Sequence, residues 1–291
     1  MDPCHPCHHC LRPTFTARLG VDLECEAAIN LIAAPGQGAG RLLDDLRGLT
    51  GRGPRLVANL KRHRASLPAL VTDLWSQAGL GGGAPTSLGE LCDRLERDLP
   101  AAALLLHRFD VLLDNPELDP AYDDAFINAL NALRNRGLSL VCVSARRLAQ
   151  HVILTPGGVR TGSILDLARE DLPVLAWSEV MAEIERRHLC LDEKDRARLA
   201  AAVLDNPCPW DFLDLACRRL ADGVNPTWSL RKRLKRWAQE VHRDGRRLGP
   251  GSVVRLRHRL QTWWRASGLG KLLPLARLGA WIGGFFPGGR G

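Results

Sequence analysis

Residues 27–42 read AAINLIAAPGQGAGRL, and this stretch decides the fold. Residues 27–34 form a short apolar run, which predicts a buried strand. The segment 35–41 is a turn rich in proline and glycine. The leucines that follow it recur at helical spacing: Leu42, Leu43, Leu46 and Leu49. The stretch therefore predicts a strand, a glycine loop and a helix, a connection whose backbone N–H groups can approach a phosphate closely.

The same alternation continues along the chain. Apolar runs and stripes predict strands at 55–60, 101–106 and 138–143, and helices at 66–80, 87–99 and 123–136. Strands that are apolar throughout and separated by helices are typical of a parallel sheet covered on both faces. Ligands of such sheets bind at the carboxyl ends of the strands. The glycine loop, residues 107–110 and residues 144–147 each follow a strand, so we expect them to form one site.

Beyond Arg147 the pattern becomes helical. Amphipathic segments predict helices at 179–187, 193–204 and 210–220, and no further strand of comparable strength follows. We therefore predict an α/β protein with a second, helical part. Its expected domains are an N-terminal Cys/His-rich segment (1–24), an α/β domain (25–150), a small helical lid subdomain (151–226) and a basic, Trp-rich helical arm (227–291).

Composition supports a globular protein with an unusual charge distribution. The 291 residues are 45% hydrophobic and 25% charged, which argues against disorder, collagen or a polytopic membrane protein. Residues 1–226 hold 25 Lys+Arg and 30 Asp+Glu, a net charge of −5, whereas residues 227–291 hold 15 and 2, a net charge of +13. Five of the eight Trp lie in this C-terminal part. We expect it, and not the body, to contact an anionic partner.

Cysteine usage and the apolar runs predict the compartment. No signal peptide is visible and no uninterrupted apolar run reaches 18 residues. Nine Cys, an odd number, do not suggest a disulfide framework. We therefore expect a cytoplasmic protein, with peripheral contact to a membrane through the C-terminal arm as an extension of that expectation.

Three cysteines near the N-terminus have the spacing of metal ligands. Cys4, Cys7 and Cys10 repeat as C-x-x-C-x-x-C with histidines between them, and thiolates with imidazoles can bind Zn²⁺. No second C-x-x-C pair follows, although structural zinc sites usually have one. Two interpretations stay open: a zinc site on these cysteines, and a frayed N-terminus with incidental metal affinity.

With these elements in this order, residues 26–222 resemble the AAA+/STAND group of P-loop ATPases. Residues 104–116 (LLLHRFDVLLDNP) are similar to its Walker B stretch, and residues 124–144 are similar to the helix and sensor strand that follow. Residues 175–179 (LAWSE) and 206–213 (NPCPWDFL) stand where the lid helices of this group begin and where a G-x-P-x-x-L motif often occurs. The resemblance implies a P-loop NTPase-like sheet, a helical lid and an ATP site.

The motifs depart from a working ATPase. A phosphate loop reads G-x-x-x-x-G-K-[ST], in which the Lys reaches the phosphates and the hydroxyl binds Mg²⁺. Here Pro35, Arg41 and Leu42 occupy the first Gly, the Lys and the hydroxyl positions. In the Walker B stretch, His107 and Arg108 occupy the two carboxylate positions. We therefore expect a pseudo-ATPase, with neither bound Mg²⁺ nor hydrolysis.

Binding of ATP or ADP without hydrolysis is a separate question. The glycines still allow close backbone approach, and Arg41 and Arg108 could replace the charge of the metal. The candidate nucleotide-binding residues are Gly36, Gln37, Gly38, Gly40, Arg41, Arg108, Asp110, Ser144 and Arg146. The alternative is that the glycine turn only connects a strand to a helix and binds nothing.

The C-terminal arm contains two basic amphipathic helices, predicted at 228–247 and 253–266. The candidate contacts to an anionic partner are Arg231, Lys232, Arg233, Lys235, Arg236, Trp237, Arg255, Arg257, Arg259, Trp263 and Trp264. Basic faces with Trp suit nucleic acid, and opposed basic and apolar faces suit an anionic membrane surface. The apolar stretch 269–286 favours a membrane or protein partner, and a third alternative is that the apolar stripes pack on the lid while the arginines are solvated.

Together these features predict an interaction protein: a degenerate AAA+/STAND-like, non-hydrolysing regulatory or scaffolding subunit of a larger assembly. Two alternatives stay open. One is an active ATPase of the same group in which Arg41 replaces the Lys, and the other is a nucleic-acid-binding adaptor that uses the fold as a platform.

Overall fold

The computed structural model describes residues 9–113, 117–145, 154–155, 158–159, 165, 167–224 and 227–247. The chain divides into two compact units, Met1–Ala238 and Gln239–Gly291. All elements below lie in the first unit, except that the last helix continues into the second.

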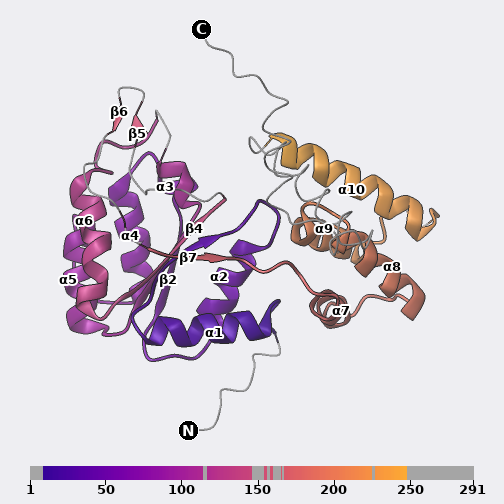
Figure 1. The fold of residues 1–291 in the computed structure, drawn as a ribbon, viewed down its shortest axis with the longest axis horizontal. Helices are drawn as coiled ribbons and strands as arrows, with labels where there is room; N and C mark the ends of the chain where they lie inside the picture. The colour runs from indigo at the N-terminus through magenta and orange to yellow at the C-terminus, as the bar shows by residue number, and fades with distance from the viewer. Residues whose placement is uncertain are drawn as a thin grey trace, which may run out of the picture. The chain divides into compact units, whose positions relative to one another are not determined.

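The centre of the fold is a five-stranded, all-parallel sheet (Figure 1). Its strands are β1 (Ala28–Ile32), β2 (Arg55–Asn59), β3 (Ala103–His107), β4 (Ser139–Ser144) and β7 (Ala168–Asp171), in the order β2-β3-β4-β1-β7. The first four lie where apolar runs predict them, and the predicted α/β class with a parallel sheet is confirmed. A separate antiparallel pair is formed by β5 (Leu154–Thr155) and β6 (Gly158–Val159).

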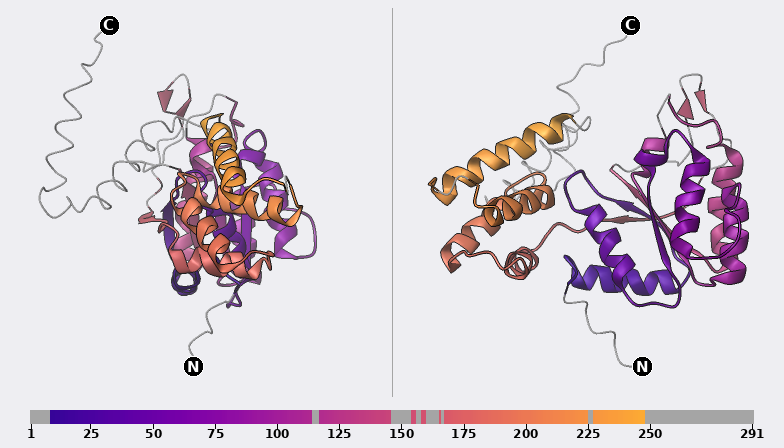
Figure 2. Two further views of the ribbon diagram at one scale, coloured as in Figure 1. Left: turned by 90° about the vertical axis from the view of Figure 1, so that its right-hand side faces the viewer. Right: turned by 180° about the vertical axis from the view of Figure 1, so that it is seen from behind.

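Helices cover both faces of the sheet. One face carries α1 (Pro13–Glu24) and α2 (Ala39–Gly48), and the other carries α4 (Leu67–Ala78), α5 (Leu88–Asp98) and α6 (Asp124–Ala132) (Figures 1 and 2). Shorter helical pieces are α3 (Leu60–His63) and the 3-10 turns η1 (Phe109–Leu112) and η2 (Leu133–Arg136). Along the strand order, the chain passes from β1 to β2 in one direction and from β2 through β3 and β4 to β7 in the other. Since crossovers between parallel strands are right-handed, helices in the two kinds of connection lie on opposite faces of the sheet.

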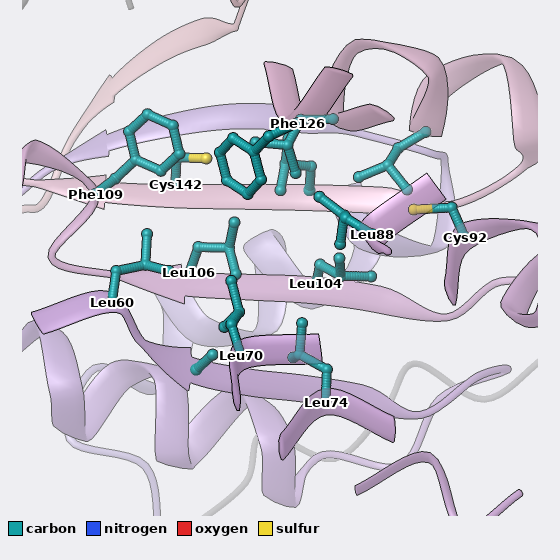
Figure 3. Close-up of a cluster of buried hydrophobic side chains, with 14 of the residues drawn as sticks. Leu60, Leu70, Leu74, Leu88, Cys92, Leu104, Leu106, Phe109, Phe126 and Cys142 are labelled. Atoms are coloured by element: carbon teal, nitrogen blue, oxygen red, sulfur yellow. The ribbon is translucent and has the colours of Figure 1, made fainter. Parts of the chain in front are cut away.

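Alternate residues of each strand feed two separate cores. Leu104 and Leu106 of β3 pack with α4, α5 and α6 in a cluster that includes Phe126 and Cys142 (Figure 3). Leu105, between them, packs with α1 and α2. Because strand side chains alternate between faces, a strand that is apolar at every position requires cover on both sides.

The sequence analysis predicts neither the first helix nor the last strand of the sheet. The segment 13–24, assigned to a Cys/His-rich N-terminal part, forms helix α1 and buries Phe15, Leu19 and Leu23 against the sheet. Strand β7 has the polar sequence ARED and is largely exposed at the edge of the sheet. An edge strand of this composition leaves no apolar signal, because little of it is buried.

A helical part follows the sheet, as predicted. Its helices are α7 (Trp177–Arg186), α8 (Glu193–Leu204), α9 (Pro209–Ala221) and α10 (Leu230–Arg247). Its interior contains Val180, Ile184, Leu199, Phe212 and Leu213, all at most 1% exposed. Among the described residues, no helix is long and apolar enough to cross a membrane.

Candidate functional site

A cavity of about 190 Å³ lies at the carboxyl ends of β1, β3 and β4. It is lined by the glycine loop, by residues after β3 and β4, and by Trp210 and Asp211 of α9. The connection after β1 runs to one face of the sheet and the connections after β3 and β4 run to the other, which is where ligands bind in open parallel sheets. The fold therefore gathers polar groups at this position.

Most of the predicted nucleotide-binding residues meet at this cavity. Those that line it are Gly36, Gly38, Gly40, Arg41, Arg108, Asp110 and Ser144. Gln37 lies in the same loop but is 8% exposed, and its side-chain oxygen has no hydrogen-bond partner. Arg146 lies outside the described residues.

The glycine loop ends in an open helix N-terminus. Gly36 and Gly38 have φ angles of 78° and 86°, in the left-handed region that favours glycine. Gly38 is the N-cap of α2 and provides no side-chain cap. Gly38 thus offers no side-chain oxygen to the first N–H groups of α2, and a helix N-terminus of this kind favours an anion.

The start of α9 covers the glycine loop. The Trp210 N–H donates to the Gly36 carbonyl at 2.9 Å. A Cβ atom on Gly36 would lie 2.4 Å from Cys208 Cβ, and one on Gly38 would lie 2.9 Å from Trp210 Cγ. In this structure a side chain at Gly36 or Gly38 would clash with α9 or the residue before it. The sequence analysis instead explains these glycines by the close approach of a phosphate.

The guanidinium of Arg41, at the predicted Lys position, already has partners. Its Nε donates to Asp45 Oδ1 and its Nη2 donates to the His9 carbonyl, both at 2.7 Å. Its Nη1 lies 4.0 Å from Glu183 Oε1. The charge of Arg41 is therefore partly balanced by two carboxylates, although the side chain borders the cavity.

Arg12 is a site residue that the sequence does not reveal. It is 1% exposed, and its guanidinium donates to the Gln37 carbonyl at 2.7 Å and to the Pro173 carbonyl at 3.0 Å. Burial lowers the pKa of Arg12 to about 10, against the opposing charges of Glu179 and Asp45. The side chain thus ties the glycine loop to the segment before α7. A single arginine in an unpatterned N-terminal stretch carries no signal of this role.

The positions that would bind Mg²⁺ in a working ATPase do not fit that ion. Leu42 is 1% exposed within the core formed with α1. Burial, with a smaller contribution from Arg108, lowers the pKa of His107 to about 4, so the imidazole is neutral near pH 7. Within the described part of the chain, no group of three His, Cys, Asp or Glu could hold a metal.

Two carboxylates and a second arginine complete the lining. Asp110 and Asp211 border the cavity, and Asp110 Oδ1 is buried without a hydrogen-bond partner. Arg108 has a φ of 63°, unusual for a residue with a side chain. Ser144 is 1% exposed and donates through Oγ to Asn30 Oδ1 at 2.9 Å, so a buried asparagine of β1 supports this end of β4.

The other predicted sites are only partly described. Cys10 is 6% exposed, whereas Cys4 and Cys7 lie outside the described residues, so the zinc site stays a prediction. On α10, Arg231, Lys232, Lys235 and Arg236 are exposed and Arg233 is half-buried. Trp237 is 1% exposed, which corrects its assignment as a contact to a partner: the ring packs inside the fold. Outside the described residues lie Arg255, Arg257, Arg259, Trp263 and Trp264.

Comparisons with known proteins add little to this geometry. No protein-family model and no curated protein matches the chain. Solved structures that match include PCH-2 of C. elegans, with a TM-score of 0.41 and 12% identity over 79% of this chain and 68% of that chain. Similarity at this level does not carry a function from one protein to another.

Proposed function

We propose that this protein is a non-hydrolysing, AAA+/STAND-like regulatory or scaffolding subunit, which binds the phosphate end of ATP or ADP without Mg²⁺ and acts within a larger assembly. The observation that carries the proposal is the chemistry at two positions. A core leucine, Leu42, stands where a hydroxyl would hold Mg²⁺, and a neutral histidine, His107, stands where a carboxylate would orient it. Both oxygens that a P-loop ATPase uses to hold Mg²⁺ for phosphoryl transfer are thus replaced, although Asp110 and Asp211 border the cavity.

Anion binding is supported by what remains at the cavity. The uncapped start of α2 and the Arg108 side chain both border it. The charge of Arg108 interacts with Asp211, which also borders the cavity. Helix N-termini and arginines together recognise phosphate oxygens. Arg108 is therefore the residue best placed to bind a phosphate.

Because the cavity is small, binding of a nucleotide would require the start of α9 to move. Sites for drug-sized ligands usually measure at least about 300 Å³, and this cavity measures about 190 Å³. It is large enough for a phosphate group, and the rest of a nucleotide would have to extend past Cys208 and Trp210, which cover the glycine loop. A nucleotide would thus displace the start of α9, and such a displacement is a signal that a regulatory subunit can pass to a partner.

Titration calorimetry of the full chain with ATP and ADP, with Mg²⁺ and with EDTA, tests the proposal. We expect equal affinities in the two conditions and no phosphate release above background. Arg108→Ala should weaken binding by about 10-fold, the effect of one charge-assisted hydrogen bond. Trp210→Ala should strengthen it, because the cover of the loop is removed. Arg47→Ala, an exposed arginine at the far end of α2, is the matched control and should change nothing.

Two results would contradict the proposal. Binding that requires Mg²⁺, together with phosphate release that disappears in Arg41→Ala, would favour the active ATPase. Absence of binding to both the wild type and Trp210→Ala would favour a glycine turn that is only a connector.

A further inference from the structure

The outward face of α10 is basic while its other face is buried. Leu230, Leu234 and Trp237 are 6%, 5% and 1% exposed. We name the exposed side the α10 basic face, and it consists of Arg231, Lys232, Lys235 and Arg236. Helix α10 holds eight Lys+Arg against two acids, Glu240 and Asp244. The positive charge of this face is therefore balanced only in part by acids of its own helix.

Trp228 helps to order the cations of this face. The Lys232 ammonium lies 4.2 Å and the Arg236 guanidinium 5.3 Å from the centre of its ring. Trp228 lies just before the first residue of α10, and Lys232 and Arg236, four residues apart on the helix, both reach its ring. Cation–π contacts of this kind restrain long side chains, which reduces the entropy lost when they bind a partner.

We propose that the α10 basic face binds the phosphate backbone of double-stranded nucleic acid. The inference does not depend on whether the cavity binds a nucleotide. A helix that lies in a membrane inserts its apolar face, but on α10 that face is occupied by the fold. Stacking on unpaired bases needs an open aromatic ring, and Trp228 is already in contact with two cations. The α10 basic face can therefore bind a partner mainly through its positive charge.

The charge density of a duplex matches this face. Residues 231–236 span about 7.5 Å of helix axis, at 1.5 Å per residue. A duplex carries one charge for each 1.7 Å of its axis, which is about four charges over that length. The four exposed cations thus have a linear charge density similar to that of the duplex, whose phosphates lie on both strands. No base edge is read by such a contact, so we expect binding without sequence preference.

The test compares salt dependence in the full chain. A fluorescent 20-bp duplex is titrated between 50 and 200 mM salt with the wild type and with Arg231→Ala/Lys235→Ala. Each lost phosphate contact lowers the slope of log K against log salt by about 0.9. The double variant should therefore lose about 1.8 from the slope, and the ratio of wild-type to variant affinity should fall about 12-fold over this salt range. Lys61→Ala/Arg62→Ala, two exposed cations of α3, is the matched control and should keep the wild-type slope.

Residues 248–291 are present in every variant, so the difference between variants reports on α10 alone. Vesicles containing phosphatidylserine form the second arm. An unchanged duplex slope in Arg231→Ala/Lys235→Ala would overturn the proposal, as would loss of vesicle binding without loss of duplex binding. Arg231→Glu/Lys235→Glu provides a stronger perturbation, and thermal melting confirms that each variant is folded. Equal loss with duplex DNA and duplex RNA is the expected result, because both present phosphate.

Discussion

The His107 imidazole is a titratable group at the cavity whose protonation should affect stability. Its pKa is lowered from 6.5 to about 4, first by burial and then by Arg108. In the unfolded chain the same group protonates near pH 6.5. Between these values the unfolded state binds more protons than the folded state, so the free energy of unfolding falls as the pH falls from 6.5 toward 4.

We predict that the contribution of His107 to the fall in the free energy of unfolding between pH 6.5 and pH 4 is absent in His107→Gln. A shift of this size corresponds to about 3 kcal/mol when fully developed. Urea unfolding at pH 7 and pH 4.5 should show a smaller drop in the free energy of unfolding for the variant than for the wild type. His188→Gln, at an exposed position, controls for loss of any histidine. Equal drops in His107→Gln and the wild type would mean that the folded protein protonates His107 normally.

The role of Arg12 could not be predicted from the sequence. Its importance comes from two carbonyl groups that are 25 and 161 positions away in the chain. Nothing in the residues beside it indicates those contacts. Gln77 is similar: its side-chain amide both donates to and accepts from the backbone of Val57 at 2.9 Å, and so continues the hydrogen bonding at the edge strand β2. Such contacts depend on the assembled fold.

At the scale of elements, prediction succeeded where burial leaves a pattern. Strands β1, β2, β3 and β4 are largely apolar because both their faces are covered, and runs of apolar residues along the chain predict each of them. Strand β7 lies at the edge and is polar, so it was missed. The glycine loop was located correctly, but its contact with Cys208 and Trp210 joins residues about 170 positions apart. The sequence can therefore predict where a site lies better than what occupies it.

The contact between α9 and the glycine loop makes a prediction for Gly36→Ala. The new Cβ would meet Cys208 Cβ at 2.4 Å and its backbone Cα at 2.8 Å, so a change of rotamer cannot relieve the clash. Gly79→Ala is a matched control, because Gly79 also has a positive φ of 67° but nothing within 4 Å. We expect the control to cost about 1 kcal/mol from backbone strain alone and Gly36→Ala to cost about 2 kcal/mol more from overpacking.

Urea unfolding of both variants measures this difference. Adding Cys208→Gly to Gly36→Ala removes Cys208 Cβ and Sγ, whereas Cα at 2.8 Å stays. The second change should recover part of the extra cost, which a double-mutant cycle would show as a favourable coupling. Equal costs for Gly36→Ala and Gly79→Ala would show that α9 does not press on the loop in solution.

At the scale of the whole molecule, the uneven charge distribution has to be considered together with the packing of α10. Residues 1–226 carry a net charge of −5 and residues 227–291 carry +13. This division suggests an arm that is separate from the body. The burial of Leu230, Leu234 and Trp237 shows instead that the first part of α10 belongs to the fold. One helix thus supplies apolar contacts on one side and a basic surface on the other.

This arrangement predicts that α10 stabilises the protein. A chain ending at Gly223 should melt below a chain ending at Arg247, because the side chains that cover Leu230, Leu234 and Trp237 lose their partner. Burial of each such side chain contributes about 1.5–3 kcal/mol before the entropy of ordering the helix is subtracted. A net loss of about 2 kcal/mol in a chain of this size lowers the melting temperature by about 4–8 °C.

Trp237→Ala in the longer chain should also lower the melting temperature, whereas Lys235→Ala, on the exposed side of the same helix, should not. If the two truncated chains melted at the same temperature, α10 would be an independent arm, and its basic face could not be treated as a rigid surface of the fold.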